Sequence, residues 1–327
     1  MHNDYFPPQV YLGLTYFCNL KCKHCYVHKK TTRDIPKQKI KNLIKEMANL
    51  GVFKIVLTHG ESLLRRDVFD IISFCYRLNI DTTLITNGIL LDEKTAKELK
   101  KAKVSRVVIS FDSLSKEYHN NLRGRRDCWD KAIIAMDNCK KNGLVFGLNI
   151  TINESNYSNL EGIIKFSIEK GAKDIYFLTV RNQKYINKKL LENYSDIIFR
   201  LWELKKKYNK KINIAFHDPI AIPLLANKIK TSEFKKLFIG NLCQAGISWI
   251  SIKPDGEVSL CNFLSTSFGN VYLEGLESVW KKIQSRKFPT LPNVCINCRY
   301  GDTCKGGCRA FAKKEGLADS RCNLLVK

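Results

Sequence analysis

The sequence has no apolar run long enough to cross a membrane. Its 327 residues contain no stretch of about 18 consecutive apolar residues, the length that a membrane helix needs. The first residues, MHNDYFPPQ, lack the basic and then apolar order of a secretion signal. We therefore expect a cytoplasmic protein without a membrane partner. In that compartment 13 cysteines are better explained as reduced metal ligands than as disulfides.

Acidic residues are also scarce. The chain has 31 Asp and Glu against 55 Lys and Arg, a net charge of +24, which suits an acidic partner and first of all nucleic acid. However, lysine runs such as KKKYNKK and LKKAK fall on helix faces that we expect to be solvated, and no basic and aromatic binding motif accompanies them. The charge therefore favours a solvated surface over a nucleic-acid site. It is also compatible with an acidic peptide substrate.

Apolar runs typical of strands alternate with amphipathic runs typical of helices from residue 10 to about 208. A helix is predicted after each strand, and the first ends at Gly51, a residue type that commonly caps helix C-termini. Because strands that are apolar on both faces indicate a sheet covered by helices, we expect an α/β fold with a parallel sheet curved into a partial barrel. The six predicted strands are residues 10–17, 53–59, 82–87, 106–112, 145–152 and 174–180.

Polar clusters follow the first four predicted strands, where the chemistry of a parallel barrel collects. CNLKCKHC follows the first strand, THGES the second, TNG the third and SFDS the fourth. After residue 210 the pattern changes to a short strand (212–217), a helical piece (231–238) and a cysteine-dense segment (243–327). That segment has little apolar periodicity, so we expect metal sites to hold it together.

The first cysteine group has only three members, Cys18, Cys22 and Cys25. Such a spacing arises by chance in roughly one chain of this composition in fifty. A closed structural zinc site takes four protein ligands, so three thiolates leave one position open for another molecule. With an iron–sulfur cluster as the metal, the trio indicates catalysis more than structure.

The C-terminal group, CINCRYGDTCKGGC, has a chance expectation of roughly one in a thousand. One interpretation is a structural zinc ribbon. The seven cysteines of the segment also divide into four and three, which fits cluster chemistry better than two closed zinc sites. The seven are Cys243, Cys261, Cys295, Cys298, Cys304, Cys308 and Cys322. Three others, Cys75, Cys128 and Cys139, fall in predicted helices and are interpreted as small buried hydrophobes.

Together these motifs resemble the radical S-adenosylmethionine (SAM) superfamily with a C-terminal SPASM extension. The trio, with His24 between its last two cysteines, resembles the first signature, and the seven-cysteine pattern resembles the second. The resemblance implies a partial (β/α)6 barrel of the TIM type over residues 1–210, a bridging segment over 211–242 and a small cysteine-rich SPASM domain over 243–327.

The resemblance also implies cofactors and their ligands. The trio would hold a 4Fe–4S cluster whose fourth iron binds SAM, and reduction would release a 5′-deoxyadenosyl radical. Two auxiliary clusters, expected as 4Fe–4S, would be held by Cys295, Cys298, Cys304 and Cys322 and by Cys243, Cys261 and Cys308. Trp249 stands where relatives with a fully ligated first auxiliary cluster have a further cysteine. The SAM-binding positions implied are His24, His59, Gly60, Glu61, Asn87, Ser110, Asp112 and Arg123, with His59 in place of the usual glycine.

For the reaction, the resemblance favours modification of a ribosomally made peptide or protein by crosslinking, epimerisation or oxidation. Alternatives are cofactor biosynthesis, such as haem-pathway decarboxylation suggested by LLRRD, and sulfatase maturation, disfavoured by Asn262 where that branch has Asp. A zinc-stapled binding protein is the alternative from another class.

The partners expected are an electron donor such as flavodoxin or ferredoxin and a peptide. Strand one begins near residue 10, so we expect the barrel mouth, the SPASM region or a separate recognition protein to capture the peptide. No general base or hydrogen donor is assigned. Tyr16, His119, Tyr176 and His217 are candidates, but such side chains more often have structural roles.

Overall fold

The computed structural model describes residues 5–27, 33–181, 188–216, 218–226, 228–229, 243–285, 292–312 and 317–322. The candidate His217 and the helix predicted over 231–238 lie outside these ranges. Within them, nine strands form one sheet in the order β7-β6-β5-β4-β3-β2-β1-β8-β9. The strands are β1 Gln9–Gly13, β2 Lys54–Thr58, β3 Asp81–Thr86, β4 Arg106–Ser110, β5 Phe146–Ile152, β6 Asp174–Thr179, β7 Asn213–Phe216, β8 Trp249–Ile252 and β9 Val258–Ser259.

All neighbouring pairs among β1 to β8 are parallel, and β9 runs antiparallel to β8. The predicted α/β fold with a parallel sheet is confirmed, and each of the six predicted strands overlaps β1 to β6. The short strand predicted over 212–217 is β7. Two strands were not predicted: β8 pairs with β1, and β9 follows it. They have four and two residues, too few for an alternating pattern to be visible in the sequence.

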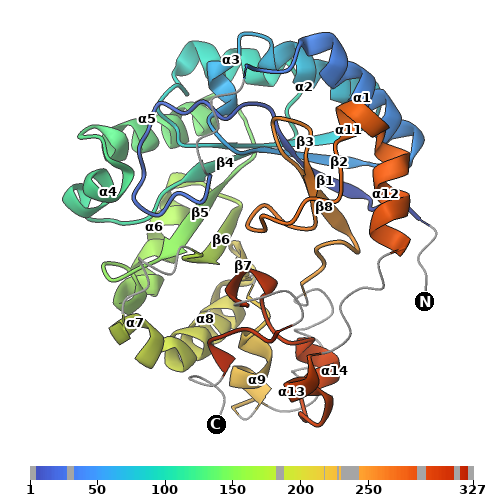
Figure 1. The fold of residues 1–327 in the computed structure, drawn as a ribbon. Helices are drawn as coiled ribbons and strands as arrows, with labels where there is room; N and C mark the ends of the chain where they lie inside the picture. The colour runs from blue at the N-terminus through green and yellow to red at the C-terminus, as the bar shows by residue number, and fades with distance from the viewer. Residues whose placement is uncertain are drawn as a thin grey trace.

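Helices lie along the outside of the curved sheet, and the last segments close over the side of the barrel beside β7 and β8 (Figure 1). The first predicted helix is α1, which buries Ile40, Leu43, Ile44 and Met47 and is followed by Gly51 in the left-handed conformation, with φ 85°. The helices are α1 Lys37–Asn49, α2 Val68–Arg77, α3 Glu93–Lys101, α4 Lys116–Arg123, α5 Cys128–Lys141, α6 Leu160–Lys170, α7 Lys188–Glu192, α8 Tyr194–Tyr208, α9 Ala221–Ala226, α11 Val271–Glu274, α12 Leu276–Ser285, α13 Asn293–Ile296 and α14 Gly301–Cys304.

The main hydrophobic core continues from the barrel into the cysteine-dense segment. Ile250, Val258, Leu276 and Trp280 belong to the same buried cluster as the residues of β1 to β6. The first part of this segment therefore packs on the barrel and not only on itself, which agrees with the little apolar periodicity of its sequence. The division into domains at residues 210 and 242 stays a prediction. Cys75, Cys128 and Cys139 are fully buried, as the sequence predicts.

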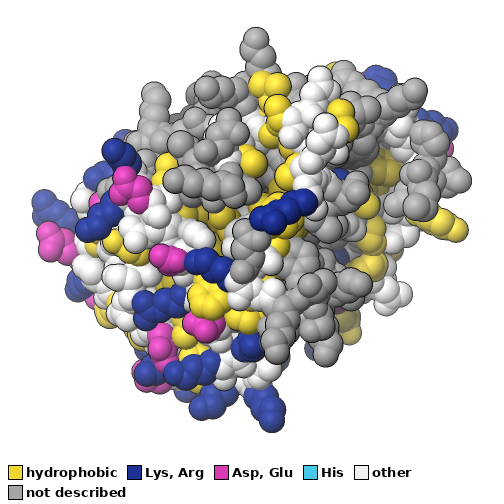
Figure 2. Space-filling view, turned by 90° about the horizontal axis from the view of Figure 1, so that it is seen from below, with side chains coloured by type: hydrophobic (Ala, Val, Ile, Leu, Met, Phe, Trp, Pro, Cys, Tyr) yellow, Lys and Arg dark blue, Asp and Glu magenta, His cyan; other side chains and the backbone are white. Residues whose placement is uncertain are grey.

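The lysine-rich surface carries interspersed charges of both signs. Figure 2 shows Lys and Arg side chains beside Asp and Glu side chains on one face of the molecule. Exposed pairs include Lys207 with Glu161 and Lys228 with Asp196, both at 2.8 Å. This mixture favours the interpretation of a solvated surface. In the described part of the chain, no helix has the length and apolar character that membrane crossing requires.

One side chain from α1 caps a helix of the C-terminal segment, and removing it should destabilise the fold. The Glu46 carboxylate accepts hydrogen bonds from the backbone N–H groups of Leu276, at 2.7 Å, and Glu277, at 3.4 Å, at the start of α12. We expect Glu46→Ala to lower the free energy of unfolding by about 1 kcal/mol, as loss of a helix cap does. Urea unfolding measures this. Glu46→Gln keeps an acceptor oxygen and should lose less; an equal loss in both variants would contradict the cap.

Candidate active site

The loop after β1 carries Cys18, Cys22 and Cys25 at the C-terminal edge of the sheet. All three are free thiols; Cys18 and Cys25 are exposed and Cys22 is half-buried. The loop is fastened on two sides. The N–H of Lys23 donates to the carbonyl of Leu122 at the end of α4, and the carbonyl of Phe17 accepts from the N–H of Glu61 after β2.

Two glycines permit these close approaches. A Cβ atom on Gly60 would lie 2.4 Å from the Phe17 carbonyl oxygen and 2.5 Å from that of Thr15. A Cβ on Gly124, directly after α4, would lie 2.7 Å from the carbonyl oxygen of Lys21 and would require a left-handed backbone, with φ 73°. Backbone therefore packs on backbone at both points, which only glycine allows.

Polar groups from two neighbouring loops face the sulfurs of the trio. Asn87 Nδ2 lies 3.8 Å from Cys18 Sγ, and Arg123 Nη1 lies 4.0 Å from Cys22 Sγ. N–H groups and a positive charge beside sulfur stabilise the negative thiolates of a cluster. Within the described residues, no three His, Cys, Asp or Glu side chains are placed to hold one metal ion. A single zinc would need its sulfurs about 2.3 Å from the metal, whereas a four-iron cluster is larger and spaces its ligands more widely. The amide of Asn87 and the guanidinium of Arg123 beside the sulfurs therefore suit the trio to a negatively charged iron–sulfur cluster.

Glu61 is a buried carboxylate beside the trio. Its oxygens accept hydrogen bonds from Thr86 Oγ1, at 3.0 and 3.1 Å, and from the N–H groups of Asn87, at 2.8 Å, and Leu63, at 3.2 Å. Burial raises the pKa of Glu61, although these hydrogen bonds oppose the shift. No Lys or Arg in the described ranges forms an ion pair with it. A cationic ligand group such as the SAM ammonium would supply the missing positive charge, so the site fits SAM.

Asp112 and Arg123 form a buried ion pair beneath the trio. Arg123 Nε and Nη2 lie 2.8 and 2.6 Å from Asp112 Oδ2, and the other oxygen, Oδ1, accepts from the N–H of Thr151 at 2.9 Å. Burial alone would raise the pKa of Asp112, but the Arg123 guanidinium and then His24, whose Nε2 lies 3.8 Å away, bring it below its usual range. Asp112 thus holds Arg123 in place. Contact of either residue with SAM stays a prediction, as it does for His24 and for Ser110, half-buried at the end of β4.

His59 keeps the backbone conformation that glycine favours. Its φ is 61°, in the left-handed region that histidine adopts more readily than most residues. The side chain is buried, and its ring centroid lies 6.1 Å from that of Tyr26 and 6.4 Å from that of Tyr16. Burial lowers the pKa of His59 to about 4, so the imidazole is neutral near pH 7. Where the family usually has glycine, this chain therefore has a neutral imidazole ring beside the loop of the trio.

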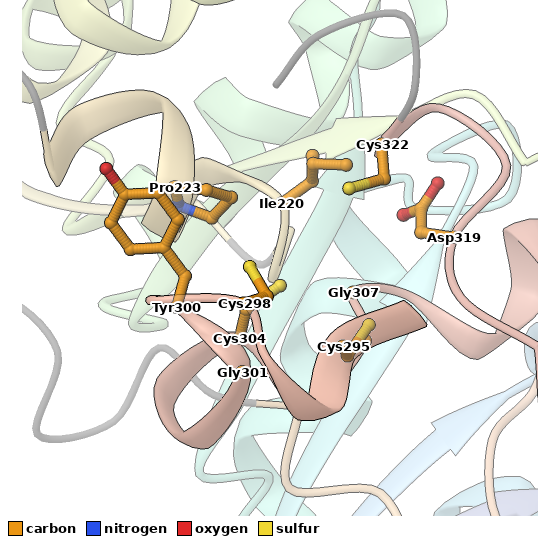
Figure 3. Close-up of a pocket in the computed structure, with 11 residues that line it drawn as sticks. Ile220, Pro223, Cys295, Cys298, Tyr300, Gly301, Cys304, Gly307, Asp319 and Cys322 are labelled. Carbon is orange, nitrogen blue, oxygen red and sulfur yellow. The ribbon is translucent and has the colours of Figure 1, made fainter. Parts of the chain in front are cut away.

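The C-terminal cysteines are brought together in two sets. Cys295, Cys298, Cys304 and Cys322 line one pocket with Ile220, Pro223 and Tyr300, and their sulfurs face a common space (Figure 3). In the second set, burial is the main cause that raises the pKa of Cys261 to about 12, and the neighbouring thiols of Cys243 and Cys308 contribute. The first set fits one cluster with four ligands, and the assignment of Cys243, Cys261 and Cys308 to a second cluster stays a prediction. Trp249 starts β8 and packs on Tyr11, with ring centroids 4.7 Å apart.

Sequence reasoning missed two residues that connect these sites. The ring of Phe263, two residues after Cys261, contacts that of Tyr26, directly after Cys25, with centroids 4.6 Å apart. The Arg181 guanidinium, just beyond β6, lies over Phe263 at 5.4 Å and 3.7 Å from Asp218. The position of Phe263 close to Cys261 was visible in the sequence, but Arg181 has no cysteine near it in the sequence, and the partners of both lie far away along the chain. Among the predicted polar candidates, His119 is buried, and its Nδ1 accepts from the N–H of Asp112 at 3.2 Å.

The parallel barrel, the open cysteine trio and the two C-terminal cysteine sets define a radical SAM enzyme. Family models agree: the radical SAM superfamily matches residues 12–167 and an iron-sulfur cluster-binding domain, SPASM, matches residues 243–308. The chain therefore belongs to the radical SAM superfamily and carries a SPASM domain. Its N-terminal domain binds a 4Fe–4S cluster and SAM, and its SPASM domain binds auxiliary iron–sulfur clusters.

Several characterised proteins are similar over nearly the whole chain. Fe-coproporphyrin III synthase of Methanosarcina barkeri is 27% identical, over 94% of this chain and 84% of the relative. The mycofactocin maturase MftC of Mycolicibacterium smegmatis is 24% identical, over 93% of this chain and 78% of the relative. Among solved structures, SuiB of Streptococcus suis bound to S-adenosylmethionine has a TM-score of 0.81 at 22% identity, covering 98% of this chain and 78% of SuiB. This last likeness shows the fold.

A methyl group on Gly60 should prevent the trio from holding its cluster. In Gly60→Ala the added Cβ would collide with two backbone carbonyls of the loop before Cys18. We expect the reconstituted variant to contain about four irons fewer per chain and to bind SAM weakly. Iron and sulfide analysis measures this. Gly51→Ala, where a Cβ meets no atom within 4 Å but alanine must adopt a left-handed backbone with φ 85°, serves as the control for backbone strain alone and should retain all its iron. Full iron content in Gly60→Ala would contradict the packing argument.

Buried neutral histidines should make the fold less stable in acid. Burial, and next the Arg123 charge, lower the pKa of His119 to about 4, whereas an unfolded histidine titrates near 6.5. The unfolded chain therefore takes up a proton that the native state refuses, and the unfolding free energy falls between about pH 6.5 and 4, by up to about 1.4 kcal/mol per pH unit. We expect His119→Asn, which keeps an acceptor for the Asp112 N–H, to reduce this fall. Urea unfolding near pH 6.5 and pH 5 measures it, and an unchanged fall would refute the assignment.

Proposed function

We propose that this protein abstracts a hydrogen atom from a ribosomally made peptide or protein as the first step of its modification. When the cluster and SAM are bound, they supply the 5′-deoxyadenosyl radical that performs the abstraction. The observation that carries the proposal is the contact between Tyr26 and Phe263. It joins the loop of the cysteine trio to that of the SPASM cysteine Cys261, so a substrate at the trio would lie beside the SPASM segment.

The chain's own residues prepare the site for SAM. Glu61 would bind the ammonium group, since its carboxylate is buried and held by three donors. Gly60 would present backbone to SAM, as the family's motif does. Asn87, which also donates to Asn19 Oδ1 at 2.7 Å, would contact SAM from the end of β3, and Ser110 would do so from the end of β4. Arg123, held by Asp112, would face the SAM carboxylate from beside Cys22, because guanidinium and carboxylate are natural bidentate partners.

A peptide substrate is supported by three observations. The net charge of +24 favours an acidic segment. The relative MftC is a maturase, and a solved structure of SuiB contains its precursor peptide SuiA, with a TM-score of 0.79 over 97% of this chain. An electron donor such as flavodoxin or ferredoxin would bind where electrons can reach the clusters, and a separate recognition protein would deliver the peptide.

Haem-pathway decarboxylation is a second candidate, because enzymes of that pathway are among the relatives of this chain. Fe-coproporphyrin III synthase and AdoMet-dependent heme synthase, both of Methanosarcina barkeri, are 27% and 26% identical to this chain. The first arginine of the LLRRD motif, which suggested this reaction, has a structural role. Arg65 is buried, and it donates to the carbonyls of Leu14, at 3.1 Å, and Ile35, at 3.2 Å, and to Asp67. The relatives therefore carry this candidate, and the motif adds little because its first arginine has a structural role.

The radical chemistry should depend on the trio and not on the buried helical cysteines. After anaerobic reconstitution we expect roughly twelve irons per chain, and SAM cleavage to 5′-deoxyadenosine on reduction. Cys18→Ala should abolish cleavage and remove about four irons. Cys139→Ala is the control, because this buried thiol lies in α5 and belongs to none of the cysteine sets. This variant should keep SAM cleavage and its full iron content. Chromatography and iron analysis measure the two quantities. About four irons in the wild type, or cleavage in Cys18→Ala, would be incompatible with the proposal.

The two candidate substrates give different products. Peptides encoded by reading frames beside the gene are incubated with the reconstituted enzyme, SAM and a reductant, in parallel with an iron porphyrin that carries propionate groups. Mass spectrometry detects loss of hydrogen from a peptide, or deuterium uptake where the change is epimerisation. Loss of carbon dioxide from the porphyrin, with every peptide unchanged, would replace the peptide proposal by the second candidate.

A further inference from the structure

A buried carboxylate joins the barrel to the last described segment of the chain. Asp218 follows β7 and is 2% exposed. Its Oδ2 accepts hydrogen bonds from Thr179 Oγ1, at 2.8 Å, and from the Tyr194 hydroxyl, at 2.5 Å. These partners come from the end of β6 and the start of α8. Groups of the barrel therefore hold Asp218 without any contribution from the C-terminal segment.

Arg321 reaches Asp218 from the other side. Its Nη1 and Nη2 donate to the two Asp218 oxygens at 2.7 and 2.8 Å, which is the bidentate geometry of a strong pair. Its Nε and Nη2 also donate to Asp319, at 3.0 and 2.7 Å. The guanidinium lies over the Phe311 ring, 3.6 Å from its centroid. Arg321 is 3% exposed, so one planar cation joins two carboxylates and a ring away from water.

This pair touches both auxiliary cysteine sets. Asp319 Oδ2, held by Arg321, accepts the backbone N–H of Cys308 at 3.0 Å. Cys308 belongs to the set with Cys243 and Cys261. Asp319 also lines the pocket of the other set, and Cys322, which completes that pocket, directly follows Arg321 (Figure 3). Asp319, which Arg321 holds, therefore contacts Cys308 of one set and lines the pocket of the other.

We propose that Arg321 is a positioning residue that sets the geometry of both auxiliary clusters by locking residues 319–322 onto Asp218. Cys322 is separated by 17 residues from Cys304, the nearest other cysteine of its set along the chain. Its place at the pocket is therefore decided by the tertiary structure. The buried pair supplies that constraint, because a guanidinium between two carboxylates has one favourable orientation. The proposal rests on the auxiliary clusters and is independent of the substrate.

The test compares iron and spectra in variants of the full chain after anaerobic reconstitution. Arg321→Met keeps the bulk and removes the pair. We expect a loss of about four to eight of roughly twelve irons, altered electron paramagnetic resonance signals from the auxiliary clusters, and an N-terminal cluster that still responds to added SAM. Arg125→Met is the matched control. Arg125 also pairs with an aspartate two residues away, Asp127, but on the surface, and its loss should change none of these readouts.

Arg321→Met also removes the bidentate partner of the buried Asp218 and leaves Arg181 at 3.7 Å, so a second variant separates positioning from general unfolding. Asp218→Asn with Arg321→Met removes both charges, and we expect it to bind SAM while it still lacks auxiliary iron. Full iron content with wild-type auxiliary signals in either variant would overturn the proposal. Failure of every peptide and porphyrin reaction would leave these readouts interpretable, because they do not depend on substrate turnover.

Discussion

The parallel pairing of β1 with β2 on one side and β8 on the other is the constraint on which the rest of the site depends. Parallel strands place their carboxyl ends at one edge of the sheet, so the loops after β1 and β2 meet there. The cysteine trio and Glu61 become neighbours for this reason. The same edge receives the SPASM segment, because β8 continues the sheet and β9 turns back beside it. The contact of Tyr26 with Phe263 follows from that return.

Both metal-binding regions rest on a buried aspartate paired with an arginine. Asp112 holds Arg123 beneath the trio, and Asp218 holds Arg321 between the auxiliary sets. In each case the aspartate is fixed first by groups of the barrel, the Thr151 N–H for Asp112 and the hydroxyls of Thr179 and Tyr194 for Asp218. Such pairs add little net stability, since burying both charges is costly. They do fix orientation, and cluster ligands need fixed orientation more than extra stability.

Much of the fold could be predicted because its elements are local in sequence. Residues 37–49 are helical because their apolar residues share one face, and Gly51 ends the pattern. Strands such as β5 are long apolar runs and are equally visible. In contrast, β8 and β9 are short, and their apolar residues pack on a barrel built from segments some 200 residues earlier. No local pattern reveals a core that is completed by distant residues.

By itself, the sequence determined which residues are predicted to carry chemistry: ten cysteines in two spaced groups, HGE after a strand, and polar residues after two others. Spacing suffices there, because a loop with three cysteines close together can present them to one cluster. Only the tertiary structure decided how those groups face one another. It paired Arg123 with Asp112, placed Cys322 in a pocket with three cysteines before it, and brought the rings of Phe263 and Tyr26 into edge-to-face contact. The last two contacts bring together segments that are distant along the chain, so they arise only when the C-terminal segment packs against the barrel.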